Sequence, residues 1–152
     1  MLNAKQLYNL VIVPALKDID LYSESAAKLV LYTAMVESRL VYLKQLGNGP
    51  ALGLFQMEPA THKDIWLNYL KYQPILHDKL KKISYSSNPE QLVYNLKYAA
   101  AMCRIHYRRV REPLPDKNDL EGMGRYWKKY YNTYLGKGSV AGFINKIDTI
   151  GV

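Results

Sequence analysis

Apolar residues recur at helical spacing along almost the whole chain, and this periodicity limits the possible folds more than any other feature of the sequence. Strand signals are nearly absent, apart from a short extended segment or hairpin around residues 46–54. The sequence therefore predicts an all-α fold with little or no β structure. The predicted helices cover residues 4–17, 23–45, 59–72, 74–83, 88–111, 116–134 and 140–147.

Prolines and capping residues mark several of the predicted helix ends. Pro14 is expected to kink or end the first helix, because proline lacks the backbone N–H that a helix interior requires. Asn88-Pro89-Glu90-Gln91 offers an N-cap followed by a proline at the first helical position. Gly47-Asn48-Gly49-Pro50 predicts an abrupt loop after the second helix. Since no linker or repeat divides the 152 residues, one domain over residues 1–152 is predicted.

The composition excludes several classes of protein. Hydrophobic residues make up 49% and charged residues 22%, as in globular domains, and no apolar run is long enough for a membrane span. No basic leader with a cleavage site begins the sequence, so we expect no secretory signal. The single Cys103 cannot form an internal disulfide, and His62, His77 and His106 share no ligand spacing. We therefore expect no metal and no cofactor.

The net charge of +8 lies almost entirely in the second half of the chain. Residues 1–76 hold 7 basic and 6 acidic side chains, whereas residues 77–152 hold 14 and 7. This half is expected to face an anionic partner, and nucleic acid, anionic lipid and the acidic polymers of a bacterial wall all fit. A basic face that serves only solubility is the alternative.

One carboxylate, Glu37, falls inside the apolar stripe of the second predicted helix. The residues three and four positions away on either side are uncharged, and Arg39 is expected to point elsewhere. Burial without a partner raises the pKa of a carboxyl group, which is what a general acid near neutral pH requires. The alternative is a glutamate at the edge of the stripe that reaches solvent or a distant basic residue.

The segments that follow Glu37 resemble the signature of the lytic transglycosylases, whose fold is related to goose-type lysozyme. Glu37-Ser38 is similar to the catalytic Glu-Ser at the end of a helix in that family. Gly53-Leu54-Phe55-Gln56 and Pro59-Ala60-Thr61 are similar to its Gly-Leu-Met-Gln and Pro-x-Thr segments, and residues 88–100 to its third conserved helix. The resemblance spans about residues 25–134 and implies a single lysozyme-like helical domain.

The last family signature, Ala-x-Tyr-Asn-Ala-Gly, is altered in this chain. The corresponding stretch is Met123-Gly124-Arg125-Tyr126-Trp127, in which Tyr126 matches the tyrosine and Trp127 replaces the asparagine. If Asn132 is instead the counterpart of that asparagine, the motif tyrosine becomes Tyr131. The ending over residues 129–138 is similar to that of bacteriophage-encoded members.

The resemblance implies that Glu37 protonates the glycosidic oxygen between N-acetylmuramic acid and N-acetylglucosamine. The same carboxylate then takes the proton of the muramyl C6 hydroxyl, which attacks the anomeric carbon and closes a 1,6-anhydro ring. A goose-type muramidase that hydrolyses the same bond is the close alternative; it needs a second acid, for which Glu58 and Asp64 are candidates. The residues implied to bind substrate are Ser38, Gln56, Met57, Tyr94, Asn95 and Tyr126.

The implied partner is bacterial peptidoglycan, with neither nucleic acid nor membrane insertion expected. A phage enzyme without a signal would be made in the host cytoplasm and reach the wall through holin pores, or within a virion in contact with other virion proteins. An inactive virion protein is one alternative. A nucleic-acid-binding module is another, and its phosphate contacts would be Arg104, Arg108, Arg109, Arg111, Lys128 and Lys129.

Overall fold

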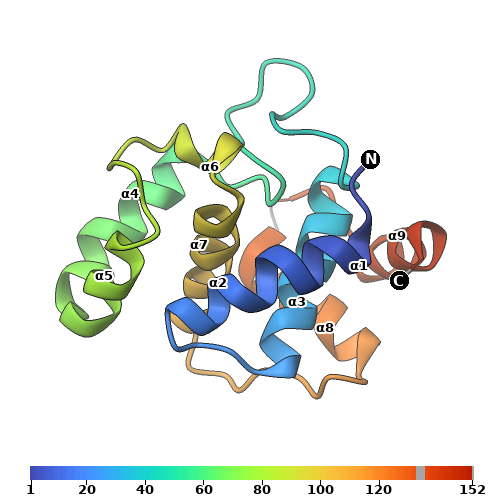
Figure 1. Cartoon of the computed structure of the whole chain (residues 1–152). Helices are drawn as coiled ribbons and strands as arrows, with labels where there is room; N and C mark the ends of the chain where they lie inside the picture. The colour runs from blue at the N-terminus through green and yellow to red at the C-terminus, as the bar shows by residue number, and fades with distance from the viewer. Residues whose placement is uncertain (133–135, 152) are drawn as a thin grey trace.

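Helix α3 (Glu24–Ser38) runs through the middle of the computed structural model, which describes residues 1–132 and 136–151. Its side chains are buried on nearly every face between Ala26 and Ser38. The N-terminal helices, α7 and α9 all pack against it, as Figure 1 shows. A helix that is apolar all round is a core helix, so α3 is the element around which the others assemble.

The arrangement of the other helices confirms the predicted all-α fold: α4 and α5 lie to one side, beyond α7, and not against α3 (Figure 1). In the described part of the chain, the only strand-like pairings are isolated bridges between Lys44 and Leu52 and between Leu52 and Met57. None of the described helices is both long and apolar enough to span a membrane. The other α-helices are α1 (Ala4–Leu7), α2 (Val13–Asp18), α4 (Pro59–Asn68), α5 (Pro74–Lys81), α6 (Gln91–Tyr94), α7 (Leu96–Arg108), α8 (Leu120–Trp127) and α9 (Val140–Ile150).

Pro14 does not end the first helix. It occupies the second position of α2, directly after a wide π-helical turn, η1 (Tyr8–Ile12). Proline removes one hydrogen bond and crowds the carbonyl one turn earlier, and a π-helical turn supplies the extra room. The chain therefore continues as one bent helical rod across α3, from α1 to α2.

The prediction that the second helix continues to residue 45 was wrong, because α3 ends at Ser38. Arg39 and Leu40 both adopt left-handed backbone conformations, with φ values of 54° and 60°. The Ser38 hydroxyl donates to the Ala34 carbonyl at 2.9 Å and accepts from the Leu40 N–H at 3.2 Å, which holds this end. Leu40 is buried in the core, and the free energy of its burial offsets the strain of the turn.

The prediction of one unbroken helix over residues 88–111 was also wrong. The chain forms the short α6 and the longer α7, with a break at Asn95, where φ is −99° and ψ is 88°. The Asn95 side chain accepts from the Tyr98 N–H at 3.2 Å and donates to the Ile83 carbonyl at 2.8 Å. An asparagine that caps a helix and binds a neighbouring segment stabilises the break.

Two further predicted boundaries differ from the structure. The helix predicted over residues 59–72 breaks at Tyr69, and a 3₁₀ turn, η2 (Leu70–Tyr72), follows. The helix predicted over residues 116–134 starts later, at Leu120, because the Asp119 side chain caps it by accepting from the Gly122 N–H. It continues into a π-helical turn, η3 (Lys128–Asn132), and its predicted end at residue 134 lies outside the described residues.

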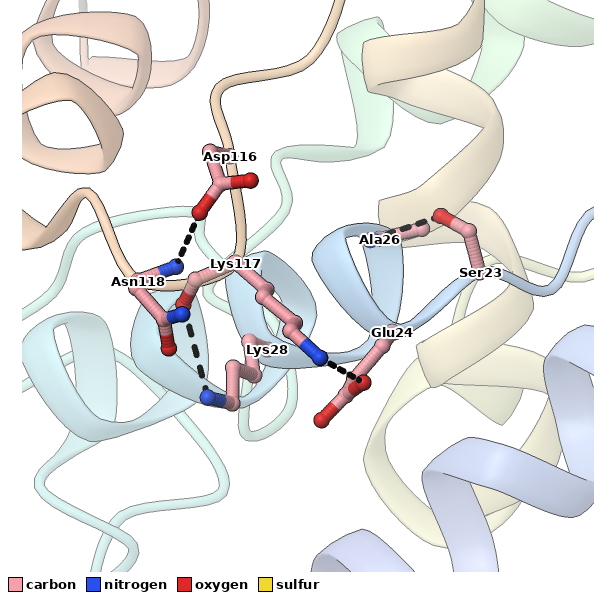
Figure 2. A network of polar contacts seen from close by, with 7 residues as sticks. All are labelled: Ser23, Glu24, Ala26, Lys28, Asp116, Lys117 and Asn118. Carbon is pink, nitrogen blue, oxygen red and sulfur yellow. Dashed lines mark hydrogen bonds and ion pairs between the residues drawn. The ribbon is translucent and has the colours of Figure 1, made fainter.

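The start of α3 is tied to the segment that precedes α8, as Figure 2 shows. The Ser23 hydroxyl caps α3 by accepting from the Ala26 N–H at 3.0 Å. The Lys117 ammonium donates to Glu24 at 2.9 Å, and Lys28 donates to the Lys117 carbonyl at 3.4 Å. Both lysine contacts are exposed, so they contribute orientation more than stability. The network fixes the first turn of α3 relative to α8.

Gly53 is expected to be indispensable for packing the 53–56 turn against α6. Its φ is +78°, and a Cβ at this position would overlap the Leu92 carbonyl oxygen. Gly47 has a similar φ of +76° but open space around it, so Gly47→Ala measures the backbone strain alone. We predict that Gly53→Ala lowers the free energy of unfolding by at least about 2 kcal/mol more than Gly47→Ala does. Urea denaturation measures the free energy of unfolding of both variants. Equal losses in Gly53→Ala and Gly47→Ala would contradict the close packing of Gly53 against Leu92.

Candidate active site

Glu37 lies in the last turn of α3, where the helix opens into a cleft of about 500 Å³. Three parts of the chain form this cleft: the end of α3 with the loop after it, the 53–56 turn, and α9. The residues that line it are Val36, Glu37, Arg39, Tyr42, Lys44, Gln45, Leu46, Gln56 and Lys146. Segments more than a hundred residues apart in sequence therefore meet at one carboxylate.

A tight turn places Gln56 in the same cleft as Glu37. Gln56 adopts a left-handed backbone with a φ of 51°, and its N–H donates to the Gly53 carbonyl at 3.1 Å. Its side-chain amide donates to the same carbonyl at 2.9 Å, which leaves the amide oxygen available. The Gly53 N–H donates in turn to the Leu43 carbonyl at 2.7 Å. The structure thus brings together two of the sequence segments on which the family resemblance is based, Glu37-Ser38 and residues 53–56.

Burial raises the pKa of Glu37 to about 7, in the direction expected from its place in an apolar stripe. Two groups partly oppose this effect. The Lys146 ammonium favours the ionised carboxylate through its charge, and the Trp127 indole N–H favours it as a donor. Lys146 is held in place because it donates to the Val36 carbonyl at 3.1 Å. Glu37 is therefore poised to hold or release a proton near neutral pH.

The Trp127 indole N–H is a buried donor with no hydrogen-bond partner among the described residues at proper geometry. The side chain is only 2% exposed and packs against Phe143 of α9, with ring centroids 5.3 Å apart. An unsatisfied buried donor is costly unless a nearby acceptor stabilises it. As a donor, the indole N–H lowers the pKa of the Glu37 carboxyl group, so Glu37 is the acceptor on which it acts.

Several of the residues implied to bind substrate are placed elsewhere. Ser38 is buried and bonds its own helix end, Met57 is buried in the core, and Asn95 is buried as the cap of α7. Tyr94 is 60% exposed and stacks on Tyr85, with the two rings 7° from parallel. None of these side chains lines the Glu37 cleft. Of the substrate-binding residues predicted, the structure places only Gln56 in that cleft.

The two candidate motif tyrosines have different hydrogen-bond partners, and Tyr131 is the one bonded to the 53–56 turn. Its hydroxyl donates to the Phe55 carbonyl at 2.6 Å, within the turn that holds Gln56. Burial raises the pKa of Tyr131 well above its usual value, and the negative charge of Glu37 adds to this effect. The Tyr126 hydroxyl donates instead to the Glu112 carbonyl at 2.9 Å, and Tyr126 lines a separate cleft. Of the two tyrosines, only Tyr131 therefore bonds the turn that carries Gln56.

Neither candidate for a second acid lines the cleft. Glu58 is exposed and stands just before the first residue of α4. Asp64 accepts from Arg109 at 2.8 Å and from Asn68 at 2.6 Å, and these two donors lower its pKa. Among the described residues that line the cleft, Glu37 is the only carboxylate.

The cations of the cleft were not foreseen from the sequence. Arg39 was expected to point away from Glu37, and this was wrong because α3 ends one residue before it, which brings Arg39 into the cleft lining. Lys44 follows in the same loop, whereas Lys146 comes from α9. Arg39 and Lys44 fall inside the helix predicted over residues 23–45, and no local motif singles out Lys146.

No cluster of three or more His, Cys, Asp and Glu side chains suited to a metal ion occurs in residues 1–132 and 136–151. Cys103 is buried and burial raises its pKa, as in an inert thiol. Comparison of the chain with protein-family models, curated proteins and solved structures gave no match. The features of the chain that point to a function are the Glu37 cleft and the resemblance of its segments to the lytic transglycosylase signature.

Titration of Glu37 should make the stability of the protein depend on pH. Its pKa is raised from 4.5 to about 7 on folding, so the folded state binds this proton more tightly than the unfolded state. The resulting stabilisation is complete below pH 4.5 and is lost as the pH rises through about 7. We predict that the free energy of unfolding of Glu37→Gln does not show this decrease with rising pH. Above neutral pH it should exceed that of the wild type by about 2 to 3 kcal/mol. Urea unfolding across this pH range tests it; a wild type and variant that differ equally at all pH values would contradict it.

Removal of the Trp127 donor should raise the pKa of Glu37 further, because the indole N–H favours the ionised carboxylate. We predict that Trp127→Phe moves the Glu37 titration to higher pH in a carbon-detected NMR experiment. Trp66→Phe is the matched control, since the Trp66 indole N–H donates to the Tyr98 hydroxyl at 2.9 Å and not toward Glu37. If the pKa of Glu37 is unchanged or lower in Trp127→Phe, the Trp127 indole N–H does not act on Glu37.

Proposed function

We propose that the chain is a peptidoglycan lytic transglycosylase that cleaves the β-1,4 bond between N-acetylmuramic acid and N-acetylglucosamine. The observation that carries the proposal is a single carboxylate, Glu37, with a pKa of about 7 in a cleft that no other described carboxylate lines. A carboxyl group that titrates near neutral pH can donate a proton in one step and accept one in the next. This is the chemistry that a one-carboxylate transglycosylase needs.

In the first step, the protonated Glu37 donates its proton to the glycosidic oxygen as the bond from that oxygen to the muramyl anomeric carbon breaks. Glu37 is then an anion, which the Lys146 ammonium and the Trp127 indole N–H stabilise. In the second step, Glu37 takes the proton of the muramyl C6 hydroxyl as the C6 oxygen bonds to the anomeric carbon. The products are a free 4-hydroxyl and a 1,6-anhydro sugar, and Glu37 ends protonated without consuming water.

The cleft favours this intramolecular route over hydrolysis. A hydrolytic glycosidase uses a second carboxylate, as nucleophile or as base for water, on the other side of the sugar. Glu58 and Asp64 do not supply one, since neither lines the cleft. A hydroxyl already held beside the anomeric carbon reacts with a high effective concentration and needs only one base. Gln56 offers its amide oxygen to a hydroxyl or acetamido group of the same sugar.

The structure gives little support to the nucleic-acid alternative. Arg104 is 8% exposed and donates to the Leu21 carbonyl at 3.0 Å, and Arg109 is paired with Asp64. Lys128 donates to the Asn132 side chain at 2.7 Å and to the Gly136 carbonyl at 3.0 Å. Half of the basic residues considered for phosphate binding are therefore engaged within the protein. The sequence ending over residues 129–138 supports a bacteriophage enzyme, either a lysis protein or a virion component that opens the wall.

We predict that Glu37→Gln lowers the rate of solubilisation of purified peptidoglycan by about 100-fold or more, because the amide cannot donate a proton. Glu58→Gln is the matched control and should retain most of the activity. Mass spectrometry of the wild-type digest should show muropeptides that end in 1,6-anhydro-N-acetylmuramic acid. Products with a new reducing end, lost in Glu58→Gln, would overturn the proposal in favour of a two-carboxylate muramidase. A wild type that releases nothing would favour the inactive virion protein.

A further inference from the structure

Two cations of the Glu37 cleft have no partner within the described protein. The Arg39 and Lys44 side chains are exposed, and neither makes an ion pair or a side-chain hydrogen bond with a described residue. Lys146, in contrast, already donates to the Val36 carbonyl and faces Glu37. The cleft therefore combines two available positive charges with one carboxylate that is largely protonated below about pH 7.

The loop that carries these cations is held in place. Arg39 lies in the left-handed turn that ends α3, and the buried Leu40 anchors it on the core side. Lys44 pairs through its backbone with Leu52, and the neighbouring Gln45 bonds Ala51 twice, at 3.0 and 3.1 Å. Strained backbone kept at a cleft is a common feature of ligand sites. Arg39 and Lys44 are thus presented on one anchored segment beside the proposed catalytic group.

A neutral sugar does not need a guanidinium or an ammonium group for its binding. Hydroxyl and acetamido groups are served by neutral partners such as Gln56, whereas guanidinium and ammonium groups bind carboxylates by charge-assisted hydrogen bonds. Peptidoglycan carries its carboxylates on the peptides attached to the muramyl lactyl groups, next to the bond that Glu37 would cleave. The position of the cations beside Glu37 matches that chemistry.

We infer that Arg39 and Lys44 bind a carboxylate of the peptide on the muramyl residue, so that the enzyme prefers peptide-bearing glycan strands over strands stripped of peptide. This inference rests on the proposed function, because it names the substrate form taken by the same cleft. The preference arises from binding and does not require turnover. It can therefore be measured in a protein that lacks the proposed general acid.

The experiment measures the dissociation constants of Glu37→Gln for soluble glycan strands with peptides and for the same strands after amidase removal of the peptides. We expect about tenfold tighter binding of the peptide-bearing strands, the size of one charge-assisted contact. Adding Arg39→Gly or Lys44→Ala should weaken that binding by about threefold and reduce the preference to about threefold, and both together should abolish it. Glycine fits the left-handed backbone of position 39, so Arg39→Gly deletes the guanidinium without risk to the fold.

Arg111→Ala and Lys63→Ala are the matched controls, since both side chains are exposed and neither lines the cleft. When each is combined with Glu37→Gln, the preference for peptide-bearing strands over stripped strands should be unchanged. Equal binding of both strands, or a preference that survives Arg39→Gly and Lys44→Ala together, would overturn the inference. Competition by inorganic phosphate but not by acetate would also overturn it, in favour of a phosphate-bearing wall polymer. A wild type that yields no 1,6-anhydro product despite this preference would refute the proposed function and leave the carboxylate site standing.

Discussion

The left-handed turn at Arg39 and Leu40 is the constraint on which the candidate site depends. Had α3 continued, the residues after Ser38 would run on along the helix axis and could not line a cleft beside Glu37. Because the helix stops at Ser38, Glu37 occupies the last turn and Arg39 enters the cleft beside it. The Ser38 bonds and the burial of Leu40 offset the strain of two non-glycine residues in this region.

Both halves of the chain tune the proton affinity of Glu37. The N-terminal half supplies the buried helix that raises its pKa, and the C-terminal half supplies Trp127 and Lys146, which limit the rise. Without these two groups the pKa of Glu37 would be higher, and the carboxyl group would hold its proton more tightly. With these partners it can lose and regain the proton. Part of the positive charge of the second half thus serves the cleft directly.

Hydrophobic periodicity was sufficient to predict the all-α fold, and it placed Glu37 in an apolar stripe where burial raises its pKa. It left open a contact between Glu37 and a distant basic residue, and Lys146 of α9 is such a residue. The family resemblance also grouped Gln56 with Glu37, and both residues line one cleft in the structure. The turn after Ser38 was missed since neither Arg39 nor Leu40 is a residue that normally ends a helix. Lys146 could not be found, because its contact with Val36 crosses 110 residues and leaves no local pattern.

Digestion of purified peptidoglycan in water enriched in the heavy oxygen isotope tests the central claim most directly. If Glu37 acts alone and the C6 hydroxyl is the nucleophile, the new muramyl ends take their oxygen from the sugar itself. Mass spectrometry should then find 1,6-anhydro products that carry no heavy oxygen from solvent. Heavy oxygen at the new muramyl ends would show that water attacks the anomeric carbon, and the single-carboxylate account of this cleft would be wrong.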